Sequence, residues 1–424
     1  MRLSGLLRPA VWGAVVALPL LLLGPLSSSQ AAATSRTAKV VRVVDGDTVK
    51  VDYDRDGEWD DAIRLIGIDT PETGQCGAGA AKRALKSLLG RKVVQLVSDT
   101  GRIGRQNRPE RRVIATVGGQ KVDATTWLLQ RGLGVWMPRK DELTNNLAHH
   151  RAVESAAAQG VGWFDEDRCG AGSAPERSLS MHVQYAADAA YKLTVAERRN
   201  QEFIRIRNDG LAPVDLDGWV LRVGNDRREH IPAGGPIPAG ETLTVHVGSG
   251  VNTVLHRYIG SSVTMLVDAD LFARKHVGGG AYLVDPGGDI RAFQTWPCAG
   301  GCADPTGGAL VISEVLINPP VRESLALNSE YIALTNRGNS AVRTGDMVVE
   351  VSPWVYEFPP DHVLEPGETL RIYGGGGEDD RLVRHIDARN PVLPDDEGRV
   401  VLRTYDAVVV DCYTWGGLSC PPSS

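Results

Sequence analysis

The chain has 424 residues, of which 42% are hydrophobic and 23% are charged, as in ordinary globular proteins. These values exclude a protein that is mainly disordered, collagen-like or coiled-coil. The 48 glycines and 24 prolines favour many turns, and therefore a β-rich architecture. The length is sufficient for about two or three domains.

The first 33 residues have the three parts of a secretory signal. Arg2 and Arg8 precede an apolar run over residues 10–26, and a segment of small residues ends at Ala33. Gly24-Pro25 interrupts the run, which is short for a membrane span. We therefore expect residues 1–33 to be removed and the protein to be secreted, with no membrane span in the mature chain.

Charge is distributed unevenly along the chain. Residues 39–170 carry 21 Lys and Arg against 19 Asp and Glu, whereas residues 171–424 carry 22 against 33. A positive balance suits a polyanionic partner. The first third of the chain is therefore the part suited to a polyanion, and the acidic remainder is not.

The even number of cysteines indicates disulfides in an exported chain. A metal site is the alternative, but no His/Cys cluster with zinc spacing accompanies them. Six cysteines allow about 15 pairings, and of these their positions along the chain favour Cys76–Cys169, Cys298–Cys302 and Cys412–Cys420.

Strand and helix patterns are interleaved over residues 39–169. Runs of β-branched and apolar residues predict strands at 40–44, 48–51, 63–66, 93–97 and 113–117. Apolar residues at i, i+4, i+7 and i+8 from Ala81 predict a helix that ends at Gly90. Asp123 is positioned to cap a short second helix, and a third covers residues 147–159. The pattern predicts a small β-barrel or sheet with three helices.

An internal repeat follows a linker at residues 170–177. Residues 202–208 match 330–336, 238–243 match 365–370, and 295–296 match 414–415, in the same order. Both units alternate apolar and polar residues between Gly, Pro and Asn turns. They predict two β-sandwiches, at 178–297 and 309–416.

Acidic residues and an arginine gather at strand ends in the first third. Asp47 ends an Asp-Gly-Asp turn, and Asp69, Thr70 and Glu72 follow the strand that carries Arg64. Carboxylate and carbonyl oxygens suit a hard cation, calcium especially. A carboxylate can act on water, and arginine grips phosphate oxygens. Each residue alone also fits a turn or a surface ion pair, but together they predict metal-assisted phosphodiester hydrolysis.

The strings Val44-Asp-Gly-Asp-Thr-Val49 and Arg64-Leu-Ile-Gly-Ile-Asp-Thr-Pro-Glu-Thr73 resemble the staphylococcal nuclease (thermonuclease) family, over about residues 39–166. The resemblance implies an OB-fold barrel with three helices and calcium-dependent cleavage of DNA and RNA. It assigns Asp47, Asp69 and the Thr70 carbonyl to calcium. It also assigns the attacking water to Glu72 and the scissile phosphate to Arg64.

A second catalytic arginine is implied by the same resemblance. In the family this arginine stands at the start of a strand. Counting back from the strand predicted at 113–117 places it at Arg112, with Arg111 as the alternative. The lysine and tyrosine that the family's type member presents to a terminal phosphate have no obvious counterparts here. The arginines between 102 and 112 form an electrostatic footprint for a phosphate backbone, or else a solvated loop.

Three other features favour structural roles. The acidic segment 54–61 predicts a hairpin turn rather than a calcium loop. Adjacent residues on a helix point in different directions, so we expect His149 and His150 to lie on a solvated face. Trp136 is expected in the core, although aromatic residues also stack on bases.

The two repeats resemble lamin-tail domains, which are immunoglobulin-like β-sandwiches. Glu202-Phe-Ile-Arg-Ile-Arg-Asn208 and Glu330-Tyr-Ile-Ala-Leu-Thr-Asn336 carry this resemblance. It implies attachment or targeting, with a cell-envelope partner, by analogy alone.

The sequence therefore predicts a secreted, monomeric, calcium-dependent endonuclease with little sequence specificity and two accessory β-sandwiches. One alternative is a noncatalytic nucleic-acid-binding module. Another is an envelope-associated adhesion protein in which the sandwiches carry the main function. Preference for DNA or RNA, endo or exo action and the ligand of the sandwiches stay open.

Overall fold

The computed structural model describes residues 34–139, 141–170, 176, 178–185, 199, 202–224, 227–263, 265–266, 269–270, 275–276, 278–300, 302–317, 326–351 and 354–421. The expected secretory signal lies outside these residues, as does most of the expected linker. Within the described part of the chain, no helix is long and apolar enough to cross a membrane.

The first part of the chain is a closed barrel with three helices. β1 pairs with β2 and β5, β2 with β3, and β5 with β6, all antiparallel, and a parallel β3–β6 pairing closes the ring. The elements are β1 (Thr34–Val43), β2 (Thr48–Asp52), β3 (Asp61–Leu65), β4 (Gly67–Asp69), α1 (Ala78–Leu89), β5 (Val93–Ser98), β6 (Glu110–Val117), β7 (Gln120–Asp123), α2 (Ala124–Leu129), β8 (Val135–Met137) and α3 (Asn146–Ala158).

The helix predictions follow from simple local chemistry and are confirmed. The side of α1 that carries Ala81, Leu85 and Leu88 is buried, as its apolar spacing requires. The Asp123 carboxylate accepts a hydrogen bond of 2.8 Å from the Thr126 amide and so caps α2. The expected mainly β fold with an OB-type barrel is therefore the observed one.

Two four-stranded sheets form the first sandwich, in the orders β14-β13-β10-β9 and β12-β11-β17-β18. Its strands, with a small β15–β16 hairpin, are β9 (Leu179–Gln184), β10 (Phe203–Asn208), β11 (Val220–Val223), β12 (Arg227–His230), β13 (Thr242–His246), β14 (His256–Tyr258), β15 (Ala269–Asp270), β16 (Lys275–His276), β17 (Gly279–Val284) and β18 (Ile290–Trp296).

The second sandwich has the same arrangement, with sheets β19-β20-β25-β26 and β23-β22-β27-β28. In each sandwich one edge pair of the first sheet is parallel, β13–β14 in the first sandwich and β25–β26 in the second. The strands, with a short β21–β24 pair, are β19 (Leu310–Leu316), β20 (Tyr331–Asn336), β21 (Val342–Arg343), β22 (Met347–Val351), β23 (Trp354–Glu357), β24 (Val363–Leu364), β25 (Thr369–Tyr373), β26 (Val383–His385), β27 (Gly398–Thr404) and β28 (Val409–Trp415).

Buried polar residues explain the repeated sequence motif. Glu202 and Glu330 are fully buried, and each accepts a backbone amide from a distant loop, Met265 in the first case and Val392 in the second. At the end of β10 and β20, the buried Asn208 and Asn336 each donate a side-chain hydrogen bond to a loop carbonyl. The repeated Glu and Asn residues thus do the same work in both units, since they satisfy backbone groups of the loops.

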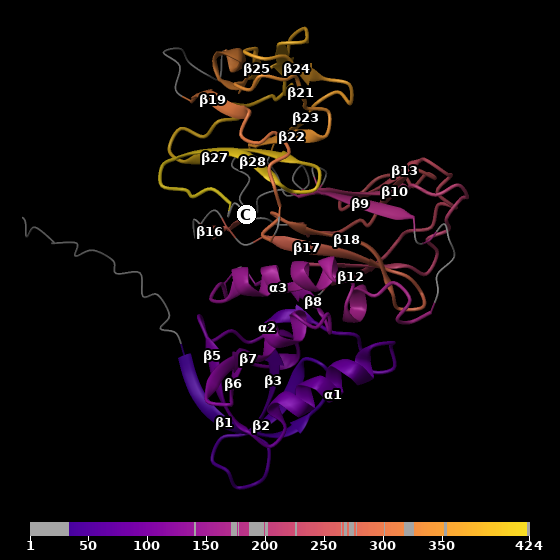
Figure 1. The fold of residues 1–424 in the computed structure, drawn as a ribbon, viewed down its shortest axis with the longest axis vertical. Helices are drawn as coiled ribbons and strands as arrows, with labels where there is room; N and C mark the ends of the chain where they lie inside the picture. The colour runs from indigo at the N-terminus through magenta and orange to yellow at the C-terminus, as the bar shows by residue number, and fades with distance from the viewer. Residues whose placement is uncertain are drawn as a thin grey trace, which may run out of the picture.

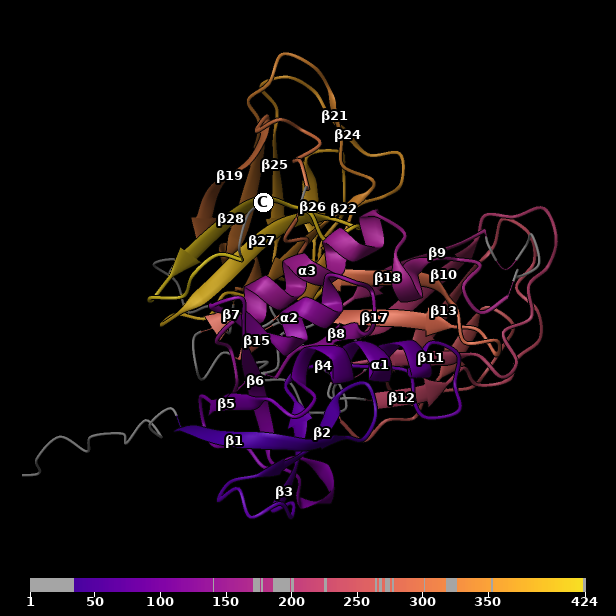
Figure 2. The ribbon, with the colours of Figure 1, turned by 60° about the horizontal axis from the view of Figure 1, so that its bottom comes forward.

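The barrel and the first sandwich share a hydrophobic core. Figures 1 and 2 show β17 and β18 beside α3 and β8, between the barrel and the second sandwich. Tyr282 and Ile290 of this sheet pack into the same buried cluster as Trp136 and Trp163. Trp163 also donates from Nε1 to the Gly288 carbonyl at 2.7 Å. The first sandwich is therefore docked on the barrel by burial of apolar surface.

The three expected disulfides are present. Cys76–Cys169 joins the start of α1 to the segment after α3, close to the first sandwich, because the Cys169 amide donates to Asp289 at 3.0 Å. It therefore fastens the barrel on the side where the sandwich docks.

Candidate active site

Asp47 lies in the turn between β1 and β2 and is nearly buried. Its Oδ2 accepts hydrogen bonds from the Thr70 amide at 3.0 Å and the Thr70 hydroxyl at 2.8 Å. Burial raises the pKa of Asp47 to about 6, against the lowering effect of Arg64 and with a further rise from Asp45 and Asp69. The Asp47 carboxylate thus joins the β1–β2 turn to the segment after β4.

Arg64 on β3 bridges the two aspartates. Its Nη1 is 2.8 Å from Asp47 Oδ2 and its Nη2 is 3.3 Å from Asp69 Oδ1. Asp69 is the last residue of β4, and its side chain is 2% exposed. The structure therefore brings Arg64, Asp47, Asp69 and Thr70 together, as the sequence pattern predicts.

Two arginines of the first sandwich reach the same carboxylate. Arg222 Nη1 lies 2.6 Å from Asp69 Oδ2 and 3.4 Å from the Thr70 carbonyl oxygen. Arg228 Nη2 lies 3.0 Å from Asp69 Oδ1 and 2.7 Å from Glu72 Oε1. Both Asp69 oxygens therefore accept hydrogen bonds from guanidinium groups.

A polar cavity of about 320 Å³ opens beside these ion pairs. Glu72 lies at its edge, with a side chain that is 53% exposed, so this carboxylate can reach water. The cavity is lined by three acidic residues, three arginines and one glutamine: Asp69, Glu72, Glu110, Arg64, Arg108, Arg228 and Gln106.

The donor chemistry at this place fits a hard cation. Asp47 and Asp69 offer carboxylate oxygens and Thr70 a carbonyl oxygen, which are the ligands that calcium prefers. Asp47 is buried, and burial raises its pKa because the charged carboxylate loses its hydration; a bound cation would compensate that charge. The same oxygens accept hydrogen bonds from arginines, so a cation that binds here replaces guanidinium contacts.

Arg112 lies away from the cavity. Its Nη2 is 3.2 Å from Asp99 Oδ1, and it is not among the described residues that line the cavity. Arg111 donates to the backbone carbonyls of Arg102 and Glu110. Among the hydrogen bonds and ion pairs of the described residues, none joins Arg111 or Arg112 to Glu72 or Asp69, and the role given to Arg112 stays a prediction.

The arginine-rich loop is only partly a solvated surface. Arg102 forms ion pairs with Glu110 at 2.8 Å and with Asp141 at 2.7 Å. Arg139 holds the same Glu110 at 3.0 Å. Arg108 instead lines the cavity, with Nη1 3.5 Å from the Thr48 hydroxyl. Among the described arginine side chains of this loop, Arg108 is therefore the one that faces the candidate site.

The expectation for His149 and His150 is wrong, because both side chains are buried. His149 bonds the α2 cap Asp123 at 3.0 Å, and His150 stacks on Trp136 with ring centroids 3.9 Å apart. Helix α3 is covered by the barrel on one side and by the first sandwich on the other, so adjacent residues can both be buried. Trp136 lies in the core, as expected.

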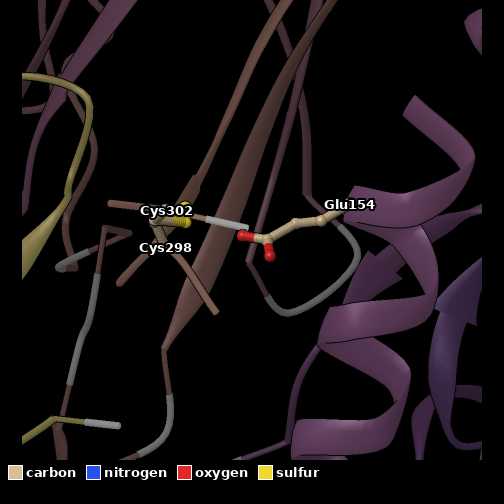
Figure 3. Close-up of side chains that lie close together, drawn as sticks. All are labelled: Glu154, Cys298 and Cys302. Carbon is tan, nitrogen blue, oxygen red and sulfur yellow. A yellow bond between two sulfur atoms is a disulfide. The ribbon is translucent and has the colours of Figure 1, made fainter. Parts of the chain in front are cut away.

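Two other groups of possible ligand side chains have structural explanations. Cys298 and Cys302 lie near Glu154, but their sulfur atoms form a disulfide (Figure 3). Glu154 accepts the Ala299 amide at 3.1 Å and thereby ties α3 to this segment. In the turn after β2, Asp52, Asp54 and Asp60 lie together; Asp52 accepts the amides of nearby turn residues, as a hairpin turn requires.

Sequence reasoning missed Arg222 and Arg228. They belong to the acidic part of the chain, which its negative charge balance excluded as a binding surface for a polyanion. The available signal was local: Arg222 and the pair Arg227-Arg228 flank the tight β11–β12 hairpin. Their target, however, lies about 150 residues earlier in the chain, so only docking reveals it.

Comparison with known proteins supports in part the two predicted resemblances, to lamin-tail domains and to thermonucleases. Residues 303–417 match the family model described as Lamin Tail Domain, so the resemblance of the second sandwich is confirmed. The thermonucleases of Staphylococcus hyicus and Staphylococcus intermedius are 49% identical over 51 residues and 46% identical over 50 residues. Each alignment covers 12% of this chain, and the chain spans 28% of the length of either relative.

Proposed function

We propose that this protein is a secreted, calcium-dependent nuclease that hydrolyses phosphodiester bonds in DNA and RNA with little sequence specificity. The observation that carries the proposal is the convergence of Arg64, Asp69 and Glu72 at one polar cavity, with Asp47 paired to Arg64 behind it. The partial similarity to thermonucleases supports it. The contacts proposed are to phosphate, which carries no direct sequence information.

Each residue has a role that follows from its position. Glu72 is exposed at the cavity edge and acts on the attacking water, as base or orienting group. Arg64 offers a planar guanidinium to the phosphate and stabilises the charge that develops on it. Asp47, Asp69 and the Thr70 carbonyl hold calcium. Bound calcium would neutralise charge on the phosphodiester oxygens.

The test compares purified residues 34–424 with the variant Glu72→Gln. Denatured DNA, duplex DNA and RNA are offered with millimolar calcium or with a chelator. We expect the parent to degrade all three only with calcium, and the variant to lose on the order of 10²-fold or more of the rate. Cleavage by the variant at the parental rate would show that Glu72 does not act on the water.

One observation favours the noncatalytic alternative. The Asp69 oxygens are engaged by arginines, and Glu72 is paired with Arg228, so the site can be read as an ion-pair network that holds two domains together. A folded parent that binds nucleic acid with calcium present but leaves it intact would favour this alternative.

The two sandwiches are proposed to attach or target the nuclease, with a cell-envelope partner. The lamin-tail match of the second sandwich supports this role by family analogy alone. Because the first sandwich is docked on the barrel, the second is the part to remove. Deletion of residues 303–424 is expected to retain cleavage and abolish retention on cells.

A further inference from the structure

The β11–β12 hairpin places two arginines directly opposite each other. Arg222 and Arg228 are cross-strand partners, so their side chains lie on the same side of the hairpin. Like charges in this position repel and destabilise an isolated pair. Asp69 compensates both by accepting from both guanidinium groups. The hairpin therefore depends on the barrel's carboxylate, and its arginines are part of the candidate site.

Arg222 has a fixed, positioning role. Its side chain is 3% exposed, and it bonds Asp69, the Thr70 carbonyl and the Gln75 side chain, the last at 3.0 Å. Its guanidinium also lies 4.5 Å above the Trp163 ring. These contacts occupy the group from several sides, so Arg222 orients Asp69 and is not available to a ligand.

Arg228 differs from Arg222 in exposure and in the way it is bonded. Its side chain is 30% exposed and lines the cavity. It donates to both Asp69 and Glu72 through Nη2. The guanidinium therefore presents an accessible edge beside Arg64 and Arg108.

The barrel strand next to Arg64 does not supply another arginine to the cavity. Glu110 is the register partner of Arg64 on β6 and lines the cavity, where Arg102 and Arg139 hold it. An anion that enters the cavity from solvent thus meets Arg64 and Arg108 from the barrel. The remaining guanidinium on the wall is that of Arg228.

We propose that Arg228, from the first sandwich, is a phosphate-binding residue of this active site. A nucleic-acid phosphate in the cavity exchanges for Glu72 as the partner of Arg228, because a guanidinium binds phosphate and carboxylate oxygens alike. The exchange also frees the Glu72 carboxylate to act on water. This inference rests on the proposed nuclease function and assigns a residue of that same site to the other domain.

The test uses residues 34–424 and the variants Arg228→Ala and Arg228→Lys, with Arg227→Ala as the matched control. Arg227 is the neighbouring residue on β12, is similarly exposed, and pairs with Glu229 rather than with the cavity. Binding of a fluorescent single-stranded oligothymidylate is measured in chelator at a series of salt concentrations. Cleavage of the same probe is then measured with calcium.

We expect Arg228→Ala to weaken binding by about tenfold and to reduce the slope of log affinity against log salt by about one, with Arg227→Ala unchanged. Arg228→Lys should keep the slope, because lysine keeps the charge, and lose part of the cleavage rate. The salt slope is a readout that a purely structural arginine does not change.

Two outcomes would overturn the inference. One is parental affinity and salt slope in Arg228→Ala; the other is faster cleavage by that variant, which would make Arg228 a group that blocks the site. If Arg228→Ala does not fold, the slope of Arg228→Gln decides in its place. If the parent binds the probe but does not cleave it, the nuclease proposal fails, while the salt slope still decides whether Arg228 contacts phosphate.

Discussion

Arg222 of the first sandwich and Asp69 of the barrel form an ion pair of 2.6 Å in which both side chains are at most 3% exposed. Burial opposes the charge on Arg222 and lowers its pKa, while Asp69 acts to raise it. Such a pair adds little to stability compared with apolar packing, but the loss of one partner leaves a buried charge. The pair therefore fixes how the two domains meet.

Arg222→Met is expected to lower the free energy of unfolding by about 3 kcal/mol, because it removes one partner of a buried pair. The value lies at the lower end for such changes, since Asp69 keeps Arg64 and Arg228. Denaturant unfolding of residues 34–424 measures it. Arg227→Met on the same strand is the control and should change little; equal stability of the two variants would contradict a structural role for Arg222.

Tyr282→Ala is expected to destabilise the junction of the barrel and the first sandwich. Tyr282 is fully buried in the shared core and donates from its hydroxyl to the Trp136 carbonyl at 3.3 Å. Truncation of a buried aromatic residue costs about 3–5 kcal/mol. Tyr413→Ala in the second sandwich is the control, because that residue is 39% exposed. Thermal unfolding of both variants provides the comparison, and a similar Tm for the two would show that the shared core contributes little.

The predictable part of the candidate site is the part that neighbouring strands bring together. Thr48 and Arg64 are register partners on β2 and β3, so the turn carrying Asp47 necessarily lies beside Arg64. By contrast, β11 meets Asp69 only after a sandwich has formed and docked. No local pattern encodes that docking, which depends on buried residues such as Tyr282.

The difference between local patterns and domain docking also explains which of the other sequence predictions succeeded. The cap at Asp123 and the apolar face of α1 are local, and both were predicted. The repeat also predicted two sandwiches, and the structure gives their main sheets corresponding strand orders. His149 and His150 were mispredicted because the burial of α3 on two sides is a property of the assembled molecule.

The Cys76–Cys169 disulfide should stabilise more than the local ones. The sequence separation is 93 residues, against 8 for Cys412–Cys420. The chain-entropy relation gives about 4–5 kcal/mol for the long loop and about 2–3 kcal/mol for the short one. Paired Cys→Ser variants, compared by denaturant unfolding under oxidising conditions, test the order. A larger loss from the short loop would show that loop entropy does not govern these bridges.

His182 is expected to make the contact between the two sandwiches sensitive to acid. Its Nδ1 lies 2.6 Å from the Tyr405 carbonyl, so this nitrogen carries the proton. Its Nε2 is buried with no hydrogen-bond partner among the described residues. Burial lowers the pKa of His182 to about 3, and Arg403 and Arg205 lower it further against the effect of the Tyr405 bond.

The direction of the pH effect follows from these values. Between pH 6.5 and about 3 the unfolded chain binds a proton that folded His182 does not. The contribution of His182 to the free energy of unfolding is therefore fully present above pH 6.5. It falls on acidification by about 1.4 kcal/mol per pH unit between the two pKa values. Urea unfolding at pH 7, 6 and 5 measures the slope. His182→Gln removes this contribution, so the slope of the variant should differ from that of the parent by about this amount; parallel slopes in parent and variant would assign the acid sensitivity to other residues.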